Sequence, residues 1–184
     1  MKLLTFIANN EIRPGVLDGG AVIDLKAAGL PVGEEGDLLQ IVRGGDAMLE
    51  RVREAIDSPS RRTFDLDDVQ LTAPLLAPSK IIAVGLNYID HCKEANLPVP
   101  AEPVLFSKFP NSITGPFDEL SWPEGVTKEV DYEVELAVVI GRRGRNIPEK
   151  DALDYVCGYS VVNDVPARDL QFANAKQWDR GKSL

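Results

Sequence analysis

Proline placement is the feature that most limits how this 184-residue chain can fold. Of its 13 prolines, eight lie between Pro74 and Pro123. Because proline lacks a backbone N–H and breaks a helix interior, this stretch is predicted to form short strands, sheet edges and shaped loops. A domain boundary is expected where the prolines begin, which divides the chain into residues 1–72 and 73–184.

The first segment has the pattern of a small α/β domain. Asp18-Gly19-Gly20 lies between two short apolar runs and predicts a β-hairpin. Apolar residues then repeat at helical spacing from Leu38 to Ile56. Gly44-Gly45 is expected to divide this stretch into two short helices, with Asp46 as the N-cap of the second.

Two strong strand patterns occupy the second segment, at 130–140 and 155–165. The first strand ends in the run 137–140, which is apolar on both faces and therefore predicts burial on both sides. A basic turn and a short helix opened by Pro148 are expected to join the two strands.

Acidic side chains alternate along the first of these strands. Asp131, Glu133 and Glu135 share one face, and Asp164 follows the second apolar run. Carboxylates this close repel one another when half-buried, and a divalent cation removes the repulsion. Oxygen ligands suit Mg²⁺, Mn²⁺ or Ca²⁺, and no Cys/His cluster in the sequence competes for zinc. The alternative is a solvated acidic strand face with an ordinary turn residue at Asp164.

A second candidate group follows the strand that is expected to end at Gly85. Asn87 could cap a short helix on which His91 and Glu94, three residues apart, are neighbours. A carboxylate beside an imidazole fixes its tautomer and raises its basicity, which is how a water-activating base is built. The alternative is a surface helix with an incidental His–Glu pair.

Cationic side chains follow Asp164 along the chain, at Arg168, Lys176, Arg180 and Lys182. They could hold the carboxylates of an anionic substrate, or they could form an ordinary mixed-charge surface.

The overall charge limits the partners. A net charge of −9 makes nucleic acid an unfavourable partner, and no apolar run reaches membrane-spanning length. Two cysteines cannot build a disulfide framework, so we expect a reducing compartment, the cytoplasm by default.

Five ordered motifs between residues 80 and 182 resemble the fumarylacetoacetate hydrolase family, in particular its branch of fumarylacetoacetate hydrolase domain-containing proteins. The motifs are Val84–Tyr88, the pair His91 and Glu94, Glu102–Lys108, Glu133–Leu136, and Asn163–Asp169. The resemblance implies an α+β, mainly β fold: a mixed β-sandwich roll around a central site, with a small N-terminal α/β domain, usually as a homodimer.

The resemblance also implies roles for individual residues. The metal ligands would be Glu133, Glu135 and Asp164. The catalytic pair would be His91 and Glu94, on a segment that can close as a lid. Substrate oxygens would contact Arg168, Gln171 and Lys182, and Lys182 would also neutralise developing charge or donate a proton.

The implied reaction is Mg²⁺-, Mn²⁺- or Ca²⁺-dependent cleavage of a C–C bond in small dicarboxylic, 1,3-dicarbonyl or 2-oxo acids, such as an acylpyruvate. The same metal–enolate site would support tautomerisation or decarboxylation of oxaloacetate, and members of this branch can be mitochondrial. The family continues beyond Gly181–Ser183, so the resemblance implies a C-terminally truncated chain with an incomplete roll, exposed strand edges and exposed apolar surface. A truncated, non-catalytic metal-binding relative is the competing class.

Overall fold

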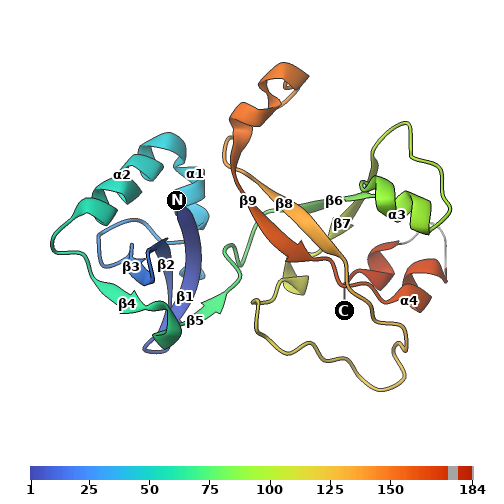
Figure 1. Ribbon diagram of the computed structural model, residues 1–184, viewed down its shortest axis with the longest axis horizontal. Helices are drawn as coiled ribbons and strands as arrows, with labels where there is room; N and C mark the ends of the chain where they lie inside the picture. The colour runs from blue at the N-terminus through green and yellow to red at the C-terminus, as the bar shows by residue number, and fades with distance from the viewer. Residues whose placement is uncertain (174–177, 184) are drawn as a thin grey trace. The chain divides into compact units, whose positions relative to one another are not determined.

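The computed structural model describes residues 1–173 and 178–183, and within them the chain has the expected α+β fold (Figure 1). It forms two compact units. The first comprises Met1–Ala77, Ile113–Leu120 and Glu135–Val162. The second comprises Pro78–Ser112, Ser121–Val134 and the residues from Asn163 onward. The division into domains 1–72 and 73–184 stays a prediction.

A five-stranded antiparallel sheet organises the first unit. Its order is β4-β3-β2-β1-β5, and its strands are β1 (Lys2–Ala8), β2 (Glu11–Asp18), β3 (Ala21–Asp24), β4 (Thr63–Asp65) and β5 (Gln70–Thr72). The predicted hairpin is confirmed, since Asp18 pairs with Ala21 across the turn. Gly19 adopts φ +62° there, a conformation that glycine reaches without steric cost. A 3₁₀ turn, η1 (Leu66–Asp68), connects β4 to β5.

Two helices follow the hairpin, as predicted: α1 (Leu39–Arg43) and α2 (Gly45–Asp57). The prediction of Asp46 as the second N-cap was wrong, because Gly44 is the cap and Asp46 lies inside the first turn. Gly45 has φ +58°, so the helix can restart two residues earlier than a side-chain cap at Asp46 would require. Buried apolar residues of both helices join those of β2 and β3 in one core: Val16, Ile23, Leu25, Leu30, Leu38, Ile41, Val42, Val52 and Ala55.

Asp37 connects two loops of this unit and is 1% exposed. Its Oδ1 accepts the Leu39 N–H at 3.1 Å, and its Oδ2 accepts the Leu76 N–H at 2.7 Å. Asp37→Ala would leave both donors without this partner, so we expect a loss of about 2–3 kcal/mol in the free energy of unfolding. Urea denaturation measures it, with the exposed Asp67→Ala as control. Equal midpoints for the two variants would contradict this role.

The strands β8 (Val134–Ile140) and β9 (Val156–Asn163) form a separate two-stranded sheet. Hydrogen bonds join Gly141 to Tyr155 at one end and Glu133 to Asp164 at the other, so the strands run antiparallel. Both predicted strands are therefore present, although β8 begins at 134 rather than 130. The intervening 3₁₀ helix η3 (Glu149–Tyr155) has Pro148 as its N-cap rather than as its first helical residue.

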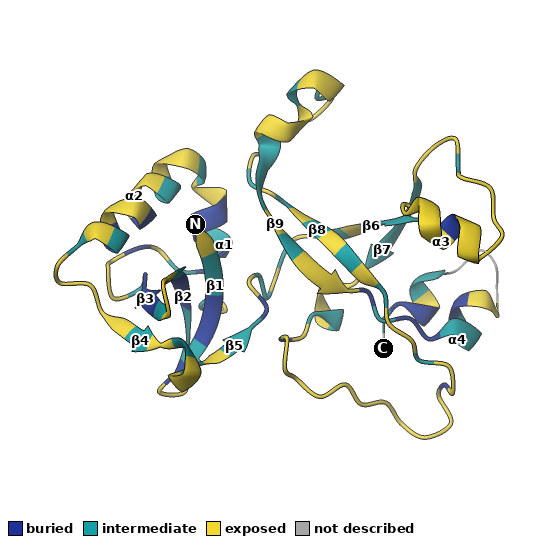
Figure 2. Ribbon diagram, in the orientation of Figure 1, coloured by how far each residue is buried: buried dark blue, intermediate teal, exposed yellow. Residues whose placement is uncertain are grey.

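Burial alternates along β8, as Figure 2 shows. The prediction of burial on both faces was wrong for this chain. One face includes Val139, which packs with Cys157 of β9 against the core of the first unit. The opposite face is exposed to solvent and is formed by Val134, Leu136, Val138 and Ile140.

The second unit is built on the antiparallel pair β6 (Ile81–Gly85) and β7 (Val104–Lys108). Between them lies α3 (Ile89–Glu94), and later segments add η2 (Pro110–Ser112), α4 (Arg168–Phe172) and η4 (Trp178–Gly181). The proline-rich stretch contains short elements, as expected, because its one α-helix has six residues. In the part of the chain that the structure describes, no helix combines the length and the apolar character needed to cross a bilayer.

Candidate active site

Paired backbone segments place the candidate carboxylates of the second unit. The N–H of Asp164 donates to the carbonyl of Glu133 at 2.9 Å, and the N–H of Glu133 donates to Asn163 Oδ1 at 3.0 Å. Further along, the N–H of Asp131 donates to the carbonyl of Pro166 at 3.0 Å. The segments 131–133 and 163–166 are thereby held side by side, which brings together side chains 31 positions apart in the sequence.

The three predicted metal ligands converge. Glu133, Glu135 and Asp164 each offer a carboxylate oxygen, and these oxygens all lie within 4.8 Å of one another. Glu133 and Glu135 are half-buried and Asp164 is buried. Such a group can share one cation through oxygen ligands, the donor type preferred by Mg²⁺, Mn²⁺ and Ca²⁺.

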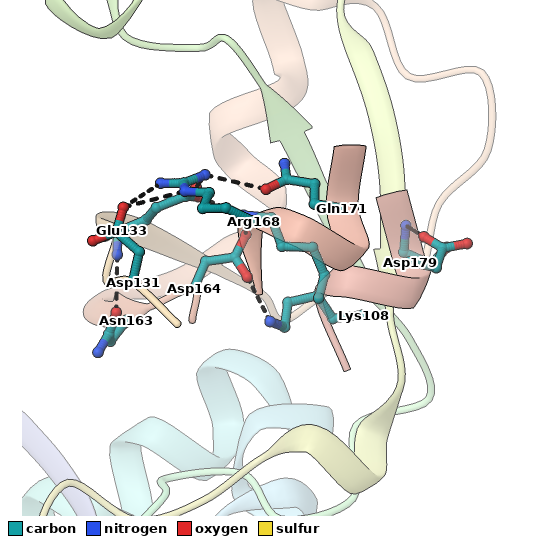
Figure 3. Close-up of polar contacts among 10 residues, drawn as sticks. Lys108, Asp131, Glu133, Asn163, Asp164, Arg168, Gln171 and Asp179 are labelled. Carbon is teal, nitrogen blue, oxygen red and sulfur yellow. Dashed lines mark hydrogen bonds and ion pairs between the residues drawn. The ribbon is translucent and has the colours of Figure 1, made fainter. Parts of the chain in front are cut away.

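Ammonium groups lie among these carboxylates. Nζ of Lys182 lies 2.5 Å from Glu133 Oε2 and 2.9 Å from Asp164 Oδ2. Nζ of Lys108 lies 2.5 Å from Asp164 Oδ1, a contact drawn in Figure 3. Lys182 is only 2% exposed, and a buried charge of this kind is tolerated because it is paired and hydrogen-bonded.

Arg168 pairs with two carboxylates of the site, those of Asp131 and Glu133 (Figure 3). Its Nη1 donates to Glu133 Oε1 at 2.5 Å and to Gln171 Oε1 at 3.2 Å, while Nη2 and Nε donate to Asp131 Oδ2 at 2.9 and 3.1 Å. Burial opposes the charge on Arg168, but these two carboxylates outweigh it and raise the pKa of its guanidinium. The pKa of Asp131 is lowered, first by the backbone N–H of Tyr132 and then by Arg168.

Aromatic packing holds Lys182 in place. The ring of Trp178 in η4 meets Phe106 of β7 edge-on, with centroids 5.7 Å apart, and Nζ of Lys182 lies 5.4 Å from the Phe106 centroid. The N–H of Ser107 donates to Asp179 Oδ1 at 3.4 Å. These contacts join η4 to β7, and η4 leads directly into Lys182.

His91 and Glu94 lie on α3, as predicted, and both are exposed. Among the described residues neither side chain has a hydrogen bond or ion pair, so the imidazole and the carboxylate are not joined in this structure. The predicted cap was wrong, since Tyr88 rather than Asn87 is the N-cap and makes no side-chain cap bond. Leu86, at φ +55°, redirects the chain before the helix and so shifts its start.

Of the remaining predicted cations, Arg180 is exposed and Lys176 lies outside the described residues. Lys108, the last residue of the motif Glu102–Lys108, was given no role in the site from the sequence. A signal was present, because Phe106 and Lys108 alternate onto one face of a strand whose other residues are mostly apolar. A lysine at the end of such a strand, on the same strand face as an aromatic residue, indicates a buried acidic partner.

The model of the fumarylacetoacetate (FAA) hydrolase C-terminal family matches residues 80–184, more than half of the chain. The chain belongs to the fumarylacetoacetate hydrolase family. It is 43% identical over 191 residues to the mitochondrial oxaloacetate tautomerase fahd2 of Xenopus laevis, with 100% of this chain and 58% of that protein covered. The chain thus spans less than two thirds of the curated relative's length.

Solved members of the fumarylacetoacetate hydrolase family share the fold. The fumarylacetoacetate hydrolase of psychrophilic Exiguobacterium antarcticum matches with a TM-score of 0.80 and 38% identity, covering 100% of this chain and 62% of that one. The maleylpyruvate hydrolase of Sphingobium sp. SYK-6, solved with manganese(II) and pyruvate, matches with a TM-score of 0.74 and 27% identity, covering 91% and 60%. These matches extend the family relationship to residues before position 80.

Proposed function

We propose that this chain carries the divalent-metal site of an enzyme that interconverts the keto and enol forms of oxaloacetate or a similar small 2-oxo acid. The observation that carries the proposal is the convergence of the Glu133, Glu135 and Asp164 oxygens beside the buried ammonium of Lys182. The relative from Xenopus laevis is an oxaloacetate tautomerase, which supports this choice of reaction.

The residues fit a divalent cation. All three candidate ligands are carboxylates, and Glu133 and Asp164 each have lone pairs beyond those engaged by Lys182, Lys108 and Arg168. In this proposal Glu133, Glu135 and Asp164 hold Mg²⁺, Mn²⁺ or Ca²⁺. When bound, such an ion supplies Lewis acidity that stabilises negative charge on a substrate oxygen.

For tautomerisation the protein has only to remove one proton from the substrate and donate another. A proton leaves carbon 3, the C–H electron pair forms the C2–C3 double bond, and the carbonyl oxygen on C2 gains a proton. We assign the removal of the first proton to His91, oriented by Glu94 once the exposed helix α3 closes over the substrate. Lys182 would stabilise charge on the oxygen and donate a proton of its own ammonium to it, while Arg168 and Gln171 would hold a substrate carboxylate.

Hydrolytic cleavage of a C–C bond in an acylpyruvate is the second candidate. It is favoured by the Sphingobium maleylpyruvate hydrolase, a structural neighbour that binds manganese(II) and pyruvate. His91 would then take a proton from water instead of from carbon, so the same residues serve both reactions. Decarboxylation of oxaloacetate would use the same stabilised enolate.

One preparation assayed for the three reactions tests the proposal. With Mn²⁺ we expect enolisation of oxaloacetate to exceed its decarboxylation and acylpyruvate hydrolysis, and we expect a chelator to abolish it. Faster hydrolysis would select the second candidate. Inertness in all three assays despite Mn²⁺ binding would instead indicate a non-catalytic metal-binding relative.

His91→Asn tests the base assignment separately. Because the variant removes the proton acceptor but no proposed metal ligand, we expect kcat to fall by about 10²-fold with Mn²⁺ affinity unchanged. Stopped-flow measurement of oxaloacetate enolisation and a Mn²⁺ titration give the two values. An unchanged kcat would remove His91 from the mechanism.

Assembly as a homodimer and a cytoplasmic or mitochondrial location also remain predictions.

A further inference from the structure

Lys108 is a charged residue of the candidate site to which the proposed mechanism gives no role. Its side chain is 14% exposed, and its Nζ lies 2.5 Å from Asp164 Oδ1. Since Oδ2 of the same carboxylate accepts Lys182, both oxygens of Asp164 are held by ammonium groups. Asp164 is a proposed metal ligand, so Lys108 occupies an oxygen that a metal ion could also use.

The strand fixes the position of this ammonium. Lys108 is the last residue of β7, pairs with Ile81 of β6, and lies on the same face as Phe106. The Phe106 ring lies near the ammonium of Lys182, so one face of β7 positions both cations beside Asp164. Figure 3 shows Lys108 reaching Asp164. A residue placed in this way by a paired strand is preorganised rather than a chance surface contact.

A divalent cation at the proposed metal site would change the balance of charge around Lys108. Both oxygens of Asp164 already face an ammonium group, and a divalent cation bound to Asp164 would add two positive charges beside Lys108 and Lys182. An ammonium is a strongly hydrated point charge, so a Lys108 that shares or loses its carboxylate requires another anion.

We propose that Lys108 is an exchange cation: it holds Oδ1 of Asp164 until a divalent cation binds there, and it then binds the carboxylate of the substrate. This rests on the proposed function. Lys108 therefore opposes metal binding and favours anion binding. A residue that only supported the local fold would favour both metal binding and anion binding.

Lys108→Met tests this opposition by binding alone, without activity. Calorimetric titration of the variant with Mn²⁺ is expected to give an affinity about tenfold tighter than wild type, because a positive charge beside a ligand is gone. Titration with pyruvate at saturating Mn²⁺ is expected to give an affinity about tenfold weaker, because the anion loses a charged partner. Lys108→Gln keeps a donor for Asp164 and should show the same two shifts, which covers the case in which the methionine variant does not fold.

Lys80→Met is the matched control. Lys80 is exposed and immediately precedes Ile81, the residue paired with Lys108, so the substitution removes the same charge next to the same pair of strands. We expect both affinities to match wild type. Weaker or unchanged Mn²⁺ binding in both Lys108 variants would overturn the exchange role while leaving the metal site intact, whereas a wild-type chain that binds no Mn²⁺ would overturn the proposed function itself.

Discussion

Glu135→Gln is expected to weaken Mn²⁺ binding by about 10²-fold or more, since the substitution keeps the shape of the side chain and removes one of three ligand charges. A bound metal raises the free energy of unfolding by about 2.7 kcal/mol at a concentration of 100 times Kd. The wild-type chain should therefore show a higher Tm with Mn²⁺, and the variant should show almost no shift at the same concentration.

The exposed Glu124→Gln is the control for this experiment, because it changes the net charge of the chain equally without touching the site. Its Mn²⁺-dependent shift should equal that of wild type. If Glu135→Gln keeps the full shift, Glu135 is not a ligand. If both variants lose the Tm shift, Mn²⁺ binding depends on the net charge of the chain and not on this group of carboxylates.

Gly181→Ala is expected to produce the second large effect. A Cβ at residue 181 would lie 2.4 Å from the backbone nitrogen of Gln171 and 2.5 Å from its Cα, which are backbone atoms that cannot rotate away. The carbonyl of Gly181 also accepts the N–H of Ala167 at 2.7 Å, so η4 and α4 are closely packed here. We expect the variant to displace Lys182, the next residue, from Glu133 and Asp164.

The expected cost of this overpacking is about 1–3 kcal/mol. For a chain of this length that corresponds to a fall in Tm of about 2–12 °C. Misplacement of Lys182 is expected to lower kcat for the proposed reaction by about 10²-fold. Gly158→Ala is the control, because a Cβ there meets no atom within 4 Å. Equal Tm and kcat in the two variants would show that the close approach at Gly181 does not position Lys182.

Local chemistry explains which parts of the fold could be predicted. The hairpin at Asp18-Gly19-Gly20 and the helix break at Gly44-Gly45 depend on the local conformational freedom of glycine, and both are present. The caps at Asp46 and Asn87 were wrong because a positive φ at Gly45 and at Leu86 changed where each helix begins. Such backbone choices depend on tertiary packing.

The candidate site was predictable where strand alternation applied. Glu133 and Glu135 share a face because side chains alternate, but their proximity to Asp164 depends on the pairing of 131–133 with 163–166, which no local pattern specifies. Lys108 was missed for the same reason, since its partner lies 56 positions away. The apolar run in β8 predicted burial on both faces, whereas burial of one face requires other segments to cover it.

Anomalous diffraction from crystals of this chain grown with Mn²⁺ tests the central claim most directly. We expect one strong anomalous peak with an oxygen of Glu133, of Glu135 and of Asp164 each roughly 2 Å away. A peak elsewhere, or ordered protein with Lys182 and Lys108 on Asp164 and no metal at saturating Mn²⁺, would contradict the account.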